Sequence, residues 1–131
     1  MLHPNQFTVN EAWLVFKLNA VPIHTELEGD FNVIALMDAA SCFILGNTFV
    51  PVGEAEPSKM AVRRLIKEAK AHKRQLPKTL FIPSGQFPSV LPAEAERQGI
   101  GIVRVPEDQL LMFIAEARES FTEHFGGGGV E

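Results

Sequence analysis

Residues 32–52 of this 131-residue chain read NVIALMDAASCFILGNTFVPV, two apolar runs separated by a short turn. The run 32–38 is almost continuously apolar, which is typical of a strand buried on both faces. The run 42–52 is also apolar, but Gly46 and Asn47 interrupt it and predict a bulge or bend. A third β-favouring stretch, 12–23, precedes them and ends at a polar break. Together they predict an antiparallel meander of three strands.

The hydrophobic period changes after residue 57. Apolar residues then recur at helical spacing, and Pro57 and Ser58 are start signals, so a helix is predicted over 57–74. Its inward residues are Val62, Leu65, Ile66 and Ala69. Pro77 ends this segment, and a short strand is predicted at 79–82.

The remainder alternates between helix and strand. A turn at 83–85 precedes a helix within 89–98, which Gly99 can cap. A strand at 100–105 follows, and a last helix runs from 106 to about 125 with Leu110, Ile114, Ala117 and Phe121 facing inward. The element order predicts an α/β fold: a mixed sheet of about five strands, with right-handed crossovers and flanking helices.

Composition sets the broad class. A length of 131 residues, 46% hydrophobic and 21% charged, favours one globular domain over 1–125, followed by a flexible glycine-rich tail at 126–131. No apolar stretch approaches the roughly 18 residues that span a membrane, and no signal peptide is readable, so a cytoplasmic protein is expected. The single Cys42 is expected to be a buried small hydrophobe. His3, His24, His72 and His124 lack metal-ligand spacing.

Several local motifs occur in a recognisable succession. Trp13 is followed by VIALMDAASCFILG at 33–46, and later by Pro83-Ser84-Gly85, Phe87, Ser89 and Gly99-Ile100. This succession resembles the ribonuclease H-like catalytic core of retroviral-type integrases and related transposases, over roughly residues 13–121. The resemblance implies a ribonuclease H-like sheet, with another three-layer α/β fold as the alternative.

The chain differs from that family at the positions that carry the catalytic carboxylates. Phosphoryl transfer in such a core needs about three carboxylates converging on two divalent ions. The resemblance places the first aspartate at Phe16 or Lys17 and the second at Pro83 or Ser84. A glutamate counterpart exists only at Glu107 or Glu116. The resemblance therefore implies a degenerate pseudoenzyme that has no catalytic residues, metal or cofactor and acts as a binding or scaffolding module.

A shifted alignment leaves an enzyme open. Asp38 would then be a metal ligand on the central strand, completed by Glu107, Asp108 or Glu116, in a Mg- or Mn-dependent nuclease or strand-transfer enzyme. The competing interpretation is that Asp38 hydrogen-bonds turn amides and that the acids near 107 cap a helix. Ser84 is interpreted as a turn serine, because no Gly-x-Ser-x-Gly elbow surrounds it.

Positive charge is concentrated in residues 57–78. This segment holds eight of the twelve Lys and Arg residues and one acid, Glu68, a net +7 within a chain of net −4. The predicted binding surface is the helix face that carries Lys59, Arg63, Lys67, Lys70 and Arg74. Such a face attracts phosphate backbones, an acidic protein partner or a second copy of the chain; the alternative is a solvated face.

The acidic net charge and the lack of interleaved aromatic residues argue against nucleic acid as the partner. A partner-binding domain of a larger bacterial-type system stays open.

Overall fold

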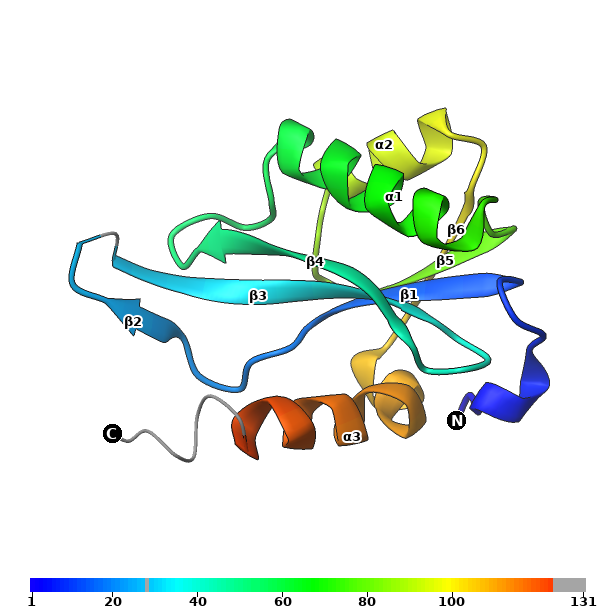
Figure 1. Ribbon diagram of the computed structural model, residues 1–131, viewed down its shortest axis with the longest axis horizontal. Helices are drawn as coiled ribbons and strands as arrows, with labels where there is room; N and C mark the ends of the chain where they lie inside the picture. Colours follow the sequence, from blue (N-terminus) through cyan, green and yellow to red (C-terminus); the bar gives the residue numbers. More distant parts are fainter. Residues whose placement is uncertain (28, 124–131) are drawn as a thin grey trace.

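The protein, seen here in a computed structural model that describes residues 1–27 and 29–123, is a mixed sheet with helices on both faces (Figure 1). The strands are β1 (Ala12–Lys17), β2 (Ile23–Thr25), β3 (Gly29–Asp38), β4 (Ile44–Pro51), β5 (Thr79–Pro83) and β6 (Gly101–Val105). The helices are α1 (Lys59–Lys73), α2 (Val90–Arg97) and α3 (Leu111–Phe121), with 3-10 turns η1 (Pro4–Gln6) and η2 (Glu107–Leu110).

The sheet has the strand order β2-β3-β1-β5-β6, and β4 pairs with β3. The pairs of β3 with β1, β2 and β4 are antiparallel, whereas β5 pairs in parallel with β1 and β6. The first half of the chain thus forms the predicted meander, and the second half adds the predicted strand-helix units. This arrangement confirms the ribonuclease H-like α/β fold.

One strand differs from its prediction. The stretch 12–23 is not a single strand, because β1 ends at Lys17 and β2 begins only at Ile23, which raises the strand number to six. The buried Asn19 causes the break: its Oδ1 accepts the backbone N–H of Val33 at 2.7 Å, and its Nδ2 donates to the carbonyl of Val21 at 2.7 Å. A side chain that bonds to the backbone in this way competes with the strand ladder.

The predicted bend in β4 is confirmed. The register with β3 shifts where Leu36 faces Gly46 and Met37 faces Ile44, so one residue of β4 is skipped. A Cβ at Gly46 would lie 3.2 Å from Cδ1 of Leu65 in α1. Glycine therefore lets α1 approach the sheet closely.

Each face of the sheet has its own apolar core. The four predicted inward residues of α1 are buried against Trp13, Ile34 and the apolar side of α2. On the other face, Phe113 and Ile114 of α3 pack on Leu14 and Phe16. In Figure 1, α1 and α2 lie above the sheet and α3 below it. The two faces therefore present separate helical surfaces.

Three further predictions concern Cys42, the C-terminal segment and membrane-spanning helices. Cys42 is only half-buried, because it lies in the turn before β4, between the exposed Ser41 and Phe43, where its backbone adopts a positive φ of 60°. The predicted tail, 126–131, and the end of the predicted last helix at 124–125 lie outside the described residues. No helix within the described ranges is long and apolar enough to cross a membrane.

Candidate functional site

The two positions at which the resemblance expects aspartates lie on neighbouring strands. β1 and β5 pair in parallel with Leu14 beside Phe81, and continuing that register by two residues brings Phe16 beside Pro83. Phe16 is fully buried in the core under α3, and Pro83 is buried at the end of β5. Neither residue carries a ligand for a cation.

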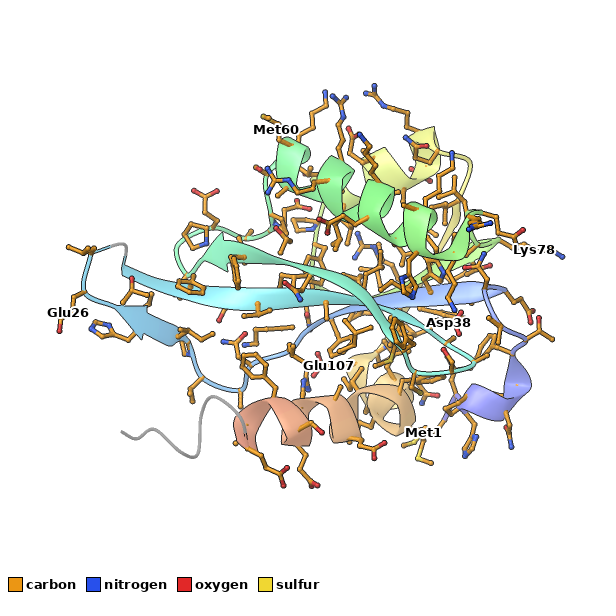
Figure 2. All side chains as sticks on the ribbon, in the orientation of Figure 1. Met1, Glu26, Asp38, Met60, Lys78 and Glu107 are labelled. Carbon is orange, nitrogen blue, oxygen red and sulfur yellow. The ribbon has the colours of Figure 1, made fainter. Side chains whose placement is uncertain are left out.

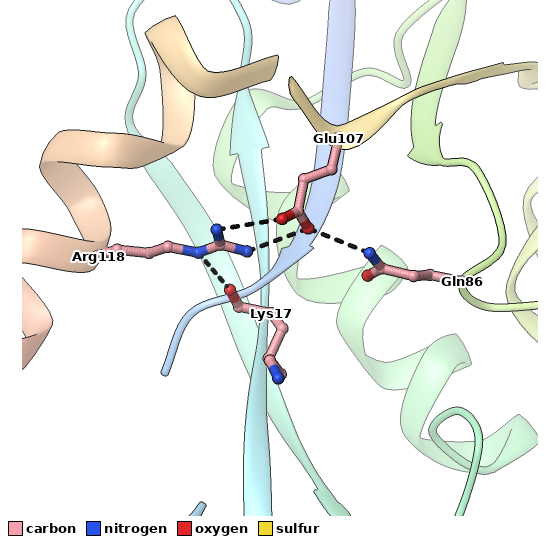
Figure 3. Close-up of polar contacts among 4 residues, drawn as sticks. All are labelled: Lys17, Gln86, Glu107 and Arg118. Carbon is pink, nitrogen blue, oxygen red and sulfur yellow. Dashed lines mark hydrogen bonds and ion pairs between the residues drawn. The ribbon is translucent and has the colours of Figure 1, made fainter. Parts of the chain in front are cut away.

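Four polar residues gather just beyond this point, at the carboxyl ends of β1, β5 and β6 (Figure 3). Arg118 of α3 donates from Nη1 and Nη2 to the two carboxylate oxygens of Glu107, at 3.3 and 3.2 Å. Its Nε donates to the backbone carbonyl of Lys17 at 2.9 Å, and Gln86 Nε2 donates to Glu107 at 3.1 Å. With Asn19 and Ala20 they line a cavity of about 410 Å³.

The charges of this cluster do not suit a divalent cation. The Arg118 hydrogen bond holds the pKa of Glu107 below its ordinary value against the opposing effect of partial burial, and the Gln86 bond and the charges of Arg118 and Lys17 lower it further. Mg²⁺ and Mn²⁺ prefer several oxygen ligands with net negative charge. Here one carboxylate faces a guanidinium, and Lys17 adds a second cation. This set of side chains therefore does not fit Mg or Mn.

Asp38 lies at the opposite end of the central strands. It pairs with Trp13, whereas Lys17, which touches the Arg118 cluster, pairs with Ile34. Four residues along a strand span roughly 13 Å. The structure therefore does not bring Asp38 and Glu107 together, and the two residues also lie apart in Figure 2.

The carboxylate of Asp38 is fully buried and closes the turn that follows β3. Its Oδ1 accepts the backbone N–H of Asn10 at 2.6 Å. Its Oδ2 accepts the N–H of Ser41 at 2.9 Å and the Ser41 hydroxyl at 2.7 Å. These contacts agree with the interpretation in which Asp38 hydrogen-bonds the amides of a turn and is not a metal ligand.

The other acids of the enzyme alternative lie elsewhere. Glu116 is exposed on α3 and lines a separate cavity of about 460 Å³ with Cys42. Burial raises the pKa of the Cys42 thiol, and the carboxylates of Glu116 and Asp38 add to the effect. Asp108 is exposed on η2. Within residues 1–27 and 29–123, no three His, Cys, Asp or Glu side chains are grouped so as to hold a metal ion.

The predicted basic surface is exposed along α1 and its exit. Arg63 is neutralised locally, since its Nε bonds to the buried carboxylate of Glu94 in α2 at 2.8 Å. Lys67 and Lys70 line a groove of about 290 Å³ between the two helices. No ion pair within the described part of the chain involves Lys59, Lys67, Lys70 or Arg74.

A stacked pair of rings lies beside the last turn of α1, which the sequence did not predict. The ring of Phe43, in the turn before β4, stacks on the imidazole of His72 with centroids 4.8 Å apart and planes 11° apart. Lys73 Nζ lies 5.9 Å from the centre of the same ring. The predicted basic face points elsewhere, because Arg63, Lys67 and Lys70 line the groove toward α2, and residues two apart on a helix, such as Lys70 and His72, do not share a face.

Comparisons with known proteins bear on the fold. No family model and no curated protein matches the chain. A chain in the cryo-EM structure of the simian T-cell lymphotropic virus intasome, in complex with PP2A regulatory subunit B56 gamma, matches with a TM-score of 0.58 and 11% identity. The match covers 88% of this chain and 39% of the other. The likeness supports the integrase-like, ribonuclease H-like fold, and it shows the fold alone.

Proposed function

We propose that this chain is a catalytically inert ribonuclease H-like module that binds a negatively charged partner through the basic face of α1, residues Lys59, Arg63, Lys67, Lys70 and Arg74. The main support for catalytic inertness is the Arg118–Glu107 ion pair, which lies beside the expected active-site positions. Two-metal catalysis needs converging carboxylates, and the one carboxylate there is bound by an arginine.

The distribution of charge supports the binding of a negatively charged partner through α1. Lys59, Lys67, Lys70 and Arg74, which form no ion pair with the described residues, lie on a segment of net +7, whereas the remainder of the chain is strongly acidic. A polyanion is repelled by the acidic remainder and attracted to α1, so the field of the protein orients the encounter. Binding would release counterions from the partner, which makes its affinity dependent on salt.

The first experiment tests inertness. The protein is incubated with single- and double-stranded DNA and RNA in Mg²⁺ or Mn²⁺, beside the variants Asp38→Asn and Glu107→Gln. We expect the same background for all three proteins. Metal-dependent cleavage by the wild type that disappears in either variant would favour the nuclease instead.

The second experiment tests the surface. Binding of a labelled single strand is measured across salt concentrations for the wild type and for the double variant Lys67→Gln/Lys70→Gln. Each lost phosphate contact lowers the salt slope by about 0.7, so we expect a decrease of up to about 1.4. The matched control, Met112→Glu/Ala115→Glu, makes the same change in net charge at exposed positions of α3, on the other face of the sheet. It should keep the wild-type slope, and an equal effect in both variants would exclude a specific α1 surface.

A further inference from the structure

A cavity of about 460 Å³ lies on the face of the sheet opposite to α1, between α3 and the turn that follows β3. Along α3 it follows one side of the helix, where Phe113, Ala117 and Phe121 recur at intervals of four residues. The segment from Phe113 to Phe121 spans roughly 12 Å. The cavity is therefore long enough for an extended small molecule.

The sheet side of the cavity is apolar. The buried side chains of Leu18 and Met37 line it, and Ile44 of β4 lines it beside them. Leu18 follows β1 directly, and β1 runs antiparallel to β3, in which Met37 pairs with Leu14. Leu18 and Met37 thus lie at opposite ends of the cavity, four residues or roughly 13 Å apart along the strand. An apolar lining with few polar groups, in a volume of roughly 300–1,000 Å³, is typical of small-molecule sites.

Negative charge acts at one end of this cavity. Glu116 is the one charged side chain among the described residues that line it, and Cys42 lines it as well. Burial raises the pKa of the Cys42 thiol, and the negative charges of Glu116 and Asp38 raise it further, so both carboxylates act at the Cys42 end. Arg118, the arginine of α3, does not offset them, because it is bound to Glu107.

We infer that this cavity binds a small amphipathic cation, an ammonium group on an elongated apolar body. The ammonium lies beside Glu116, and the apolar body extends along α3 toward Leu18 and Phe121. An anionic head group would be repelled by Glu116 and Asp38, and an uncharged one would leave Glu116 without a counter-charge. The site lies on the other side of the sheet from the basic face of α1, so the two can be occupied independently.

The test compares three probes that share an apolar body and differ in charge: phenylbutylammonium, phenylbutanol and phenylbutyrate. Calorimetric titration measures their affinities for the wild type and for Glu116→Gln, with Glu119→Gln as the matched control, since Glu119 is exposed on the same helix and does not line the cavity. Ala117→Leu narrows the cavity without a change in charge, and Ala115→Leu makes the same change at an exposed position of α3. Thermal melting verifies that the four variants fold.

We expect the wild type to bind the ammonium about threefold more tightly than the alcohol, and the carboxylate most weakly. Glu116→Gln should remove the preference for the ammonium, and Ala117→Leu should weaken binding of all three probes about tenfold. Both control variants should match the wild type. Equal affinities for the three probes would overturn the cation assignment. No binding of phenylbutylammonium, or binding that Ala117→Leu leaves unchanged, would overturn the site itself and leave the basic-face proposal standing.

Discussion

Replacing Asp38 separates the structural interpretation of this residue from the catalytic one. Its carboxylate links the start of β1 to the end of β3 through Asn10, which also accepts the indole N–H of Trp13 at 2.6 Å. Asn10 Nδ2 donates to the carbonyl of Gln75, which follows α1. Asp38 is therefore the centre of a buried polar network that joins three segments of the chain.

The cost of Asp38→Ala follows from the bonds it removes. The buried N–H of Asn10 loses its acceptor, which costs about 1–3 kcal/mol, and the two bonds to the partly exposed Ser41 add about 1 kcal/mol. We expect the free energy of unfolding to fall by roughly 2–4 kcal/mol, a large part of the roughly 5–15 kcal/mol of a typical domain. Asp38→Asn keeps one acceptor oxygen and should lose less.

Urea denaturation followed by the fluorescence of Trp13, the one tryptophan of the chain, measures both variants. Trp13 is buried and bonded within the same network, so its emission reports the unfolding of this region. A change below about 0.5 kcal/mol in Asp38→Ala would refute the structural role, because it would mean that the buried amide needs no partner.

Three further outcomes are expected. Arg118 lowers the pKa of Glu107, and a carboxyl with a lowered native pKa adds stability above its unfolded pKa near 4.3 and loses it as the pH falls through the native pKa. Urea titration should therefore show that the stability of the wild type falls more steeply than that of Arg118→Met between about pH 5 and pH 3. Parallel curves would contradict the role of Arg118 at Glu107. Arg63→Gln should lower the melting temperature, since it weakens the main partner of the buried Glu94 carboxylate, and the conservative Arg63→Lys should restore part of the loss; an unchanged melting temperature would argue against the pair. If the basic face instead docks on the acidic remainder of a second copy, size-exclusion chromatography at low salt will show a dimer or larger species that dissociates in high salt, whereas a monomer at all salt concentrations excludes self-association.

The fold could be predicted because its signals are local. The helical spacing of Val62, Leu65, Ile66 and Ala69 and the interruption at Gly46 each depend on residues close in sequence. The division of the stretch 12–23 could not be predicted, because it depends on Asn19 reaching the N–H of Val33 across a neighbouring segment.

The candidate site could be predicted only in part. The resemblance indicated which positions lack carboxylates, but not that Arg118 would bind Glu107, since that contact depends on how α3 docks on the sheet. The basic face was readable from helical periodicity alone. The ring of Phe43 stacks on His72, which lies 29 residues further along the chain, and no local pattern indicates such a contact.

The most direct test of the basic-face proposal is a two-dimensional amide NMR titration of the ¹⁵N-labelled chain with oligo(dT) at low salt. We expect the shift changes to cluster over residues 59–74, with little change on α3. Changes that centre on Lys17, Glu107 and Arg118, or no changes at all, would contradict binding through α1.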